Sequence, residues 1–159
     1  MRVVFLLTFI SGFSFGQDMK SIKKTVADIN QTKNYRIKTV PYSYFMDKNE
    51  VTDNGIELKG FYKNRMLKKM EHFVGLSACK IITQYFFSKE GKLIFVLAKK
   101  YQIVDENGYM KNPKQISESK YYYIDEKIRE VSKIPNNDDG ETDYLKEAQT
   151  LQKDLKQYK

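Results

Sequence analysis

Two residues of the 159-residue chain are single copies of reactive types: His72 and Cys79, seven positions apart. If residues 75–78 turn a hairpin, the two side chains approach one another, and a cysteine beside a histidine is an arrangement used in nucleophilic catalysis. Strand alternation instead places His72 on a face with three apolar residues, Met66, Met70 and Val74. A lone cysteine in an apolar strand is ordinarily a small core side chain, and no third residue that would orient the histidine can be identified. We therefore predict that Cys79 is structural, and we predict no catalytic residue.

The residue types of the chain give little support for a metal or cofactor site. One histidine and one cysteine cannot supply the three or four ligands of a zinc site. The acidic run at residues 136–141 lacks the alternating oxygen ligands and the distal glutamate of a calcium-binding EF-hand loop, so we interpret it as a solvated loop before a helix. Residues 75–79 lack the second glycine of a nucleophile elbow. We predict no metal site and no cofactor.

Two functional hypotheses remain. The first is a non-catalytic binding or envelope-associated protein, which meets an unknown protein or polysaccharide partner through an exposed sheet face or loop. The tyrosines at 121–123 could stack on sugars and the basic residues at 63–69 could meet an anionic polymer, although core packing and a solvated edge explain them more simply. The alternative is a hydrolase that uses carboxylates such as Glu50, Glu71 or Glu118. Isolated acidic residues are ordinary surface groups, so we favour the binding protein.

The N-terminus has the layout of a cleavable secretory signal peptide. Arg2 precedes an uncharged run from residue 3 to residue 16, which contains an apolar core and ends with the small residues Ser14 and Gly16 at the positions that signal peptidase reads. The run is shorter than the roughly 20 residues that cross a bilayer. We therefore expect residues 1–16 to be removed and residues 17–159 to be secreted to the periplasm or beyond. No cysteine follows the apolar run, so we expect no lipid anchor, and no later stretch is apolar enough to span a membrane.

The composition limits the classes of molecule that we expect this chain to bind. The formal net charge is +8, and it comes from 24 Lys and only 4 Arg among 28 basic residues. Lysine is a diffuse point charge, whereas planar recognition of phosphate groups favours arginine, so we expect no nucleic-acid partner. A single cysteine cannot form an internal disulfide, so the stability of the mature domain must come from its core. The composition indicates no particular oligomeric state.

Helical periodicity occurs at both ends of the mature chain. Apolar residues between positions 18 and 32 recur every three or four residues, at Met19, Ile22, Val26 and Ile29. A second stripe between residues 142 and 158 has the same spacing, at Tyr144, Ala148, Leu151, Leu155 and Tyr158, with a cap near Thr142. Each stripe predicts an amphipathic helix that packs on a sheet.

The middle of the chain predicts β-hairpins. An aromatic pair, a short polar turn and a basic residue beside an aliphatic one occur three times, at residues 61–67, 86–93 and 122–128. The resulting strands are near residues 56–62, 66–74, 79–87, 92–102, 117–124 and 128–132. The third and fourth strands are apolar on both faces, so we expect them to be central and covered on both sides. We expect an extended edge segment at 35–46, because Pro41 cannot donate to a sheet, and loops at 47–55, 104–116 and 135–140.

These aromatic hairpins resemble small uncharacterised secreted or periplasmic proteins of Bacteroidota-type bacteria. The likeness rests on residues 57–62, 85–96 and 121–128 and on the Ser-Phe-Gly-Gln end of the signal sequence. It implies a compartment and an architecture, and no functional site. We predict an α+β fold in one domain, residues 17–159. It consists of a single antiparallel β-meander sheet, about 35–132, with N-terminal and C-terminal helices packed on it, the latter at about 142–158.

Overall fold

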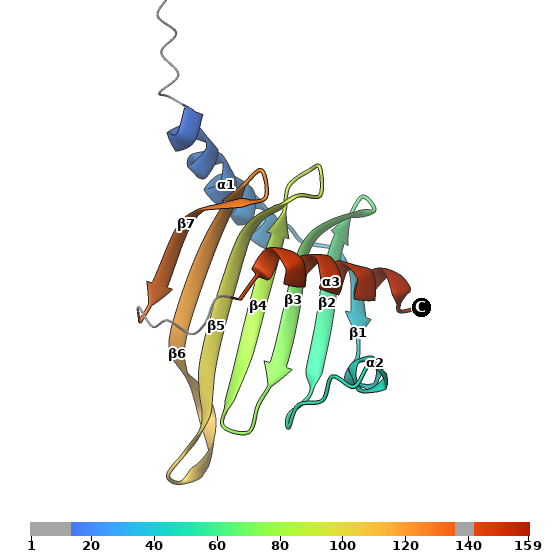
Figure 1. Ribbon diagram of the computed structural model, residues 1–159, viewed down its shortest axis with the longest axis vertical. Helices are drawn as coiled ribbons and strands as arrows, with labels where there is room; N and C mark the ends of the chain where they lie inside the picture. Colours follow the sequence, from blue (N-terminus) through green and yellow to red (C-terminus); the bar gives the residue numbers. More distant parts are fainter. Residues whose placement is uncertain (1–13, 136–141) are drawn as a thin grey trace, which may run out of the picture.

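Seven antiparallel strands lie side by side in sequence order in the computed structural model, which describes residues 14–135 and 142–159 (Figure 1). This arrangement confirms the predicted antiparallel meander with flanking helices. The strands are β1 (Arg36–Val40), β2 (Ile56–Lys63), β3 (Met66–Gly75), β4 (Cys79–Phe87), β5 (Leu93–Asp105), β6 (Gly108–Ile124) and β7 (Lys127–Ile134).

Two of the echoed hairpins close with the same tight turn. Asn64 and Arg65 join β2 to β3 with φ of 50° and 64°, and Asp125 and Glu126 join β6 to β7 with φ of 49° and 60°. Two consecutive residues at positive φ match the right-handed twist of the flanking strands, which is why two-residue hairpin loops adopt this geometry. The repeated sequence pattern therefore marks a repeated turn.

Helix α3 (Tyr144–Gln157) crosses one face of the sheet, here called the α3 face, and packs against β1, β2 and β5 (Figure 1). Its predicted stripe is confirmed, because Ala148, Leu151 and Leu155 are buried. Gly60 on β2 allows the close approach, since a Cβ there would lie 2.8 Å from a methyl carbon of Leu155. The helix is capped by Asp143, next to Thr142, and the Asp143 side chain accepts a hydrogen bond from the Lys146 N–H.

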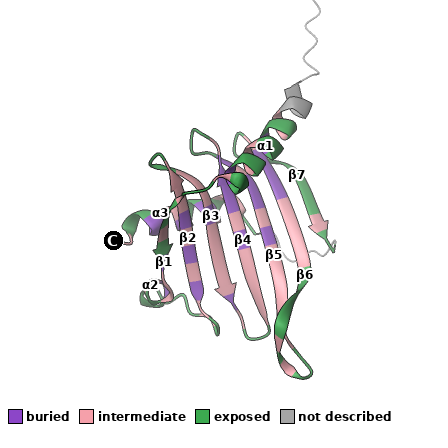
Figure 2. Ribbon diagram, turned by 180° about the vertical axis from the view of Figure 1, so that it is seen from behind, coloured by how far each residue is buried: buried purple, intermediate pink, exposed green. Residues whose placement is uncertain are grey.

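Helix α1 (Ser14–Gln31) lies on the opposite face, the α1 face, over β5 and β6 (Figure 2). Ile22 and Ile29 are buried there against three rings from neighbouring strands, those of Phe86, Phe95 and Tyr122. The predicted cleavage point after Gly16 falls in the first turn of this helix, and residues 1–13 lie outside the described residues. The signal peptide stays a prediction.

Strand β4 lies in the centre of the sheet and is covered on both faces, as predicted. Tyr85 and Phe87 belong to the core under α3, whereas Phe86 belongs to the core under α1. A bulge between Phe86 and Phe87 places Leu93 on the α3 face together with Val96, so strict alternation of side chains does not hold at this end of β5.

The face predicted for Met66, at the start of β3, was wrong, because a second bulge lies opposite Phe61 and Tyr62. The extra residue on β3 turns Leu67 toward the core and leaves Met66 exposed, so Met66 does not share the face of His72. Simple alternation fails wherever a strand carries an unpaired residue.

Two other predicted segments need correction. Residues 42–46 are not extended, because a short helix α2 (Tyr42–Asp47) begins directly after Pro41 and buries Phe45. Residues 108–116 are not a loop, because β6 begins at Gly108 and pairs with β5 in a long hairpin that extends beyond the other strands (Figure 1). Polar residues can form such a two-stranded arm because both of its faces meet solvent. The acidic run at 136–141 lies outside the described residues.

Candidate functional site

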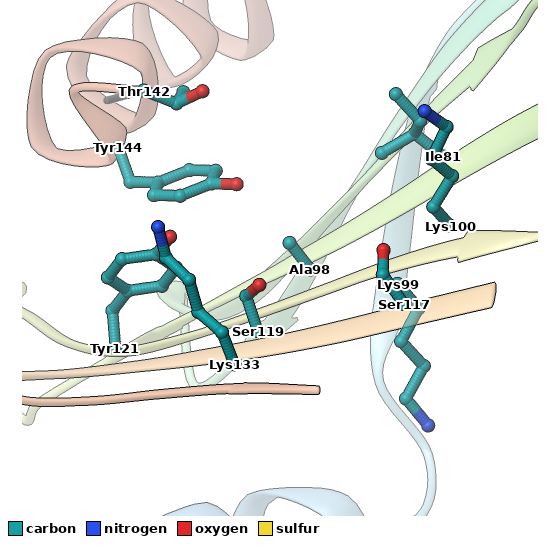
Figure 3. A pocket seen from close by; sticks show the side chains of 10 residues that line it. All are labelled: Ile81, Ala98, Lys99, Lys100, Ser117, Ser119, Tyr121, Lys133, Thr142 and Tyr144. Carbon is teal, nitrogen blue, oxygen red and sulfur yellow. The ribbon is translucent and has the colours of Figure 1, made fainter. Parts of the chain in front are cut away.

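A groove opens on the α3 face beside the first residues of α3, over β5, β6 and β7 (Figure 3). Its first chamber has a volume of about 360 Å³. The sheet register builds its floor, because Ala98 on β5 lies opposite Ser119 on β6, which lies opposite Lys133 on β7. The chamber is lined by Ile81, Ala98, Lys99, Lys100, Ser117, Ser119, Tyr121, Lys133, Thr142 and Tyr144.

Small side chains create the space. Ala98, Ser117 and Ser119 project from neighbouring strands on the α3 face, and Figure 3 shows them at the base of the groove. Elsewhere on this face, larger apolar residues fill the space under α3. Helix α3 begins only at Tyr144, so no helix of residues 14–135 and 142–159 covers these three small residues. The floor therefore presents two hydroxyl groups to the chamber.

Two lysines project into the chamber from its opposite ends. Figure 3 shows the ammonium groups of Lys100 and Lys133 on the side of the sheet that carries Tyr144. Neither lysine belongs to any ion pair formed between residues that the structure describes. Lys99, next in sequence, extends to the α1 face and pairs with Glu118 at 3.3 Å. The chamber therefore holds positive charge that these described residues do not neutralise by direct pairing.

A pair of tyrosines forms the wall at the end with Lys133. The ring centroids of Tyr121 and Tyr144 are 4.8 Å apart at an interplanar angle of 52°. Burial, with the nearby Tyr121 and Glu147, raises the pKa of Tyr144 to about 12. Its hydroxyl therefore stays protonated at physiological pH and can donate a hydrogen bond to an anion.

The groove continues past these tyrosines into a second chamber of about 600 Å³. Both chambers are lined by Tyr121, Lys133, Thr142 and Tyr144. The second chamber adds four apolar side chains that the first lacks, those of Tyr123, Ile128, Val131 and Leu145. Charged residues at its rim are Glu126, Lys127 and Asp143. The first chamber is thus polar and cationic, whereas the second has a more apolar wall and a charged rim.

A buried polar cluster lies beneath α3 next to the groove. His72 Nδ1 is 3.2 Å from Glu147 Oε1, and the ring of Tyr85 meets that of Tyr144 edge-on at 6.4 Å. Burial, followed by the charge of Glu147, raises the pKa of Tyr85. His72 Nε2 and the Tyr85 hydroxyl are both buried without a hydrogen-bond partner among the described residues. A general base has to reach its substrate, so these enclosed atoms favour a structural role.

The structure does not bring His72 and Cys79 together. His72 lies opposite Thr83, and Cys79 is four residues before Thr83 on β4. Four residues of an extended strand span about 13 Å, well beyond hydrogen-bond reach. Cys79 is partly buried at the start of the strand and has a free thiol. The structure therefore offers no Cys79–His72 pair, and the structural role of Cys79 stays a prediction.

The three carboxylates of the hydrolase hypothesis do not converge. Glu50 follows α2 and pairs with Lys48 at 3.5 Å. Glu71 accepts a hydrogen bond from Gln84 on the α1 face, and Glu118 on the same face pairs with Lys120 at 2.6 Å. Glu71 and Glu118 stand on strands three positions apart in the sheet, a separation of about 14 Å. None of the three lines the groove.

The three consecutive tyrosines at 121–123 form no exposed platform, because all three are buried. Tyr121 and Tyr123 pack under α3 and Tyr122 packs under α1, since both faces of the sheet are covered. Of the basic residues at 63–69, Lys69 lies 4.7 Å from the centroid of the Phe61 ring. These residues surround the β2–β3 turn and are not part of the groove.

Sequence reasoning missed the floor and the two lysines of the groove. One signal was present, because Ser117 and Ser119 alternate in a strand whose next residues on that face are tyrosines. Small residues at every second position mark a strip of sheet with room above it. Nothing local distinguishes Lys100 from Lys99, since their difference depends on strand register.

Residues 14–135 and 142–159 contain no group of three or more His, Cys, Asp or Glu side chains that could hold a metal ion. Within the same residues, no helix has the length and apolar character to cross a membrane. A scan against protein-family models, a search of curated proteins and a search of solved structures each return no match to this chain.

Proposed function

We propose that this chain is an exported, non-catalytic binding protein whose site is the groove between α3 and strands β5–β7. The observation that carries the proposal is the pair of lysines, Lys100 and Lys133, which enter one chamber without an acidic partner among the described residues. Two serine hydroxyls and a protonated tyrosine complete a set of donors. Such a set suits a small anion.

Binding is favoured over catalysis by the disposition of the reactive groups. Among the residues that the structure describes, no histidine or cysteine lines the groove and no carboxylate lies at the floor of its first chamber. The nearest histidine, His72, has its free nitrogen enclosed under α3. A concave site with a few directed polar groups and no general base is typical of a ligand-binding pocket.

Export to the periplasm or beyond is the second part of the proposal. It is supported by the charged N-terminus, the apolar run and the small residues Ser14 and Gly16. It places the groove in contact with solutes outside the cytoplasm.

The test is a titration of the isotope-labelled mature protein with acetate, benzoate and phosphate, followed by amide NMR. We expect at least one of these anions to shift the amide signals of Ser117, Ser119 and Lys133. Lys133→Ala and Lys100→Ala should each weaken that binding about tenfold, the loss of roughly one charge-assisted hydrogen bond.

Lys99→Ala is the matched control, because Lys99 borders the chamber but its side chain extends to the opposite face and pairs with Glu118 (Figure 3). It should leave anion binding unchanged. Equal losses in Lys99→Ala and Lys100→Ala, or no shift in the groove with any of the three anions, would contradict the proposal.

A further inference from the structure

We infer that the ligand is a free carboxylic acid with a hydrocarbon chain, held with its carboxylate at Lys133 and its chain in the apolar chamber. This inference rests on the proposed function and specifies the ligand class. It follows from the unlike chemistry of the two chambers and from the residues at their junction.

The junction is where an anionic head group would bind. Lys133 lines both chambers, and so do Tyr121 and Tyr144. A carboxylate there meets an ammonium group and the protonated hydroxyl of Tyr144, whose pKa is raised to about 12 by burial. Asp143 already caps the N-terminus of α3 by accepting from the Lys146 N–H, so the helix end itself is not the anion site. The lysine is therefore the principal charge for the head group.

The second chamber suits a flexible apolar chain. Ile128 and Val131 of β7 line it while 53% and 45% exposed, a large exposure for aliphatic side chains. Tyr123 and Leu145 close the other walls. Its volume of about 600 Å³ lies within the usual range of small-molecule sites. A hydrocarbon chain would remove these side chains from water and gain affinity with each methylene group buried.

The positive charge of Lys133 determines which kind of apolar ligand the groove should prefer. The chain has a formal net charge of +8, and Lys133 carries positive charge into the junction. A neutral alcohol of the same length would fill the apolar chamber and leave this ammonium without a partner. The groove should therefore discriminate between an acid and an alcohol of equal chain length.

The experiment is isothermal titration calorimetry of the full mature chain with hexanoate, octanoate and decanoate, and with decanol. Affinity should rise about two- to fourfold for each added methylene, up to the fourfold value of a fully buried one. Decanol should bind at least tenfold more weakly than decanoate. Lys133→Gln should abolish this preference, because it removes the charge that favours the acid over the alcohol.

Variants of the chain-binding wall test the placement. Val131→Ser and Ile128→Ser should flatten the dependence on chain length and retain the preference for an acid. Ile134→Ser is the matched control, because Ile134 belongs to the same strand, is 65% exposed and does not line the chamber. All three residues are exposed, so the variants should fold, and a circular dichroism melt confirms this.

Four outcomes overturn the inference. Affinity that does not change from hexanoate to decanoate contradicts the chain site, although short anions that still bind in the groove leave the proposed function standing. Equal binding of decanol and decanoate contradicts the head-group site. Binding to phosphatidylglycerol vesicles without binding of free decanoate indicates a membrane surface instead. Dimerisation that is lost in Val131→Ser, measured by sedimentation, indicates that a second copy covers the apolar chamber.

Discussion

Lys48 Nζ lies 2.7 Å from Asp154 Oδ1 and so joins the end of α2 to the C-terminal helix across 106 positions of the chain. The Asp154 side chain is only 3% exposed, and its Oδ1 also accepts from the Tyr44 hydroxyl at 3.1 Å. The hydrogen bond to Asp154 raises the pKa of Lys48 despite partial burial. A buried carboxylate is tolerated only when it is paired, so this contact fixes where α3 lies on the sheet.

Lys48→Met should therefore destabilise the protein by about 2–4 kcal/mol, because it leaves a buried carboxylate with a single neutral donor. Chemical denaturation at pH 7 measures the loss. The double variant Lys48→Met/Asp154→Leu removes both charges and should recover part of it. A single variant as stable as the parent would show that solvent satisfies Asp154.

Leu151→Ala should cost about 2–5 kcal/mol, because Leu151 is 4% exposed in the core under α3. Lys153→Ala on the exposed side of the same helix is the control and should change stability by less than about 0.5 kcal/mol. Thermal melts compare the two variants. Equal melting temperatures would mean that α3 does not contribute its stripe to the core in solution.

The Glu118 carboxylate predicts a pH dependence of stability. Hydrogen bonds from Lys120 and then Lys99 lower its pKa in the folded state. Because the pKa of Glu118 is lower in the folded state, the ionised carboxylate stabilises the fold at pH values above its unfolded-state pKa of about 4.3. This stabilisation is lost as the pH falls through the folded-state pKa. Glu118→Gln should therefore cost about 0.5–1 kcal/mol at pH 7 and progressively less below pH 4.

Urea denaturation of parent and variant at pH 7, 5 and 3 tests this dependence. Glu106→Gln, in the exposed turn between β5 and β6, is the control, with a difference near zero throughout. A stability gap for Glu118→Gln that widens toward pH 3 would reverse the sign and contradict the assignment.

Cys79→Ala should fold and lose about 1 kcal/mol, because it shortens a small, partly buried side chain. Anion binding in the groove should be unaffected, since Cys79 does not line it. A loss of binding with an unchanged melting temperature would give Cys79 a functional role and contradict this prediction.

Export predicts a defined mature N-terminus. Protein recovered from the exported fraction of its native host should begin at Gln17 by N-terminal sequencing, because Ser14 and Gly16 fit the small-residue requirement of signal peptidase. A recovered protein that starts at Met1 would contradict the signal peptide.

The sequence by itself determined the α+β meander and most strand positions, because the relevant signals are local. Aromatic pairs and the two-residue turns after β2 and β6 place these hairpins, and spacings of three and four residues define the buried stripes of α1 and α3. These features depend on neighbours within a few positions, so a single sequence carries them.

Tertiary structure alone decided the site. The bulges at Phe61–Tyr62 and Phe86–Phe87 change which side chains lie on the same face of the sheet. No local sequence pattern predicts these bulges. Lys100 and Lys133 line one groove because the strand register places both on the α3 face and α3 begins beyond them. The buried Asp154 carboxylate is paired with Lys48, a residue that lies far from it in the sequence. Such relationships join residues far apart in sequence, and only packing of the whole chain determines them.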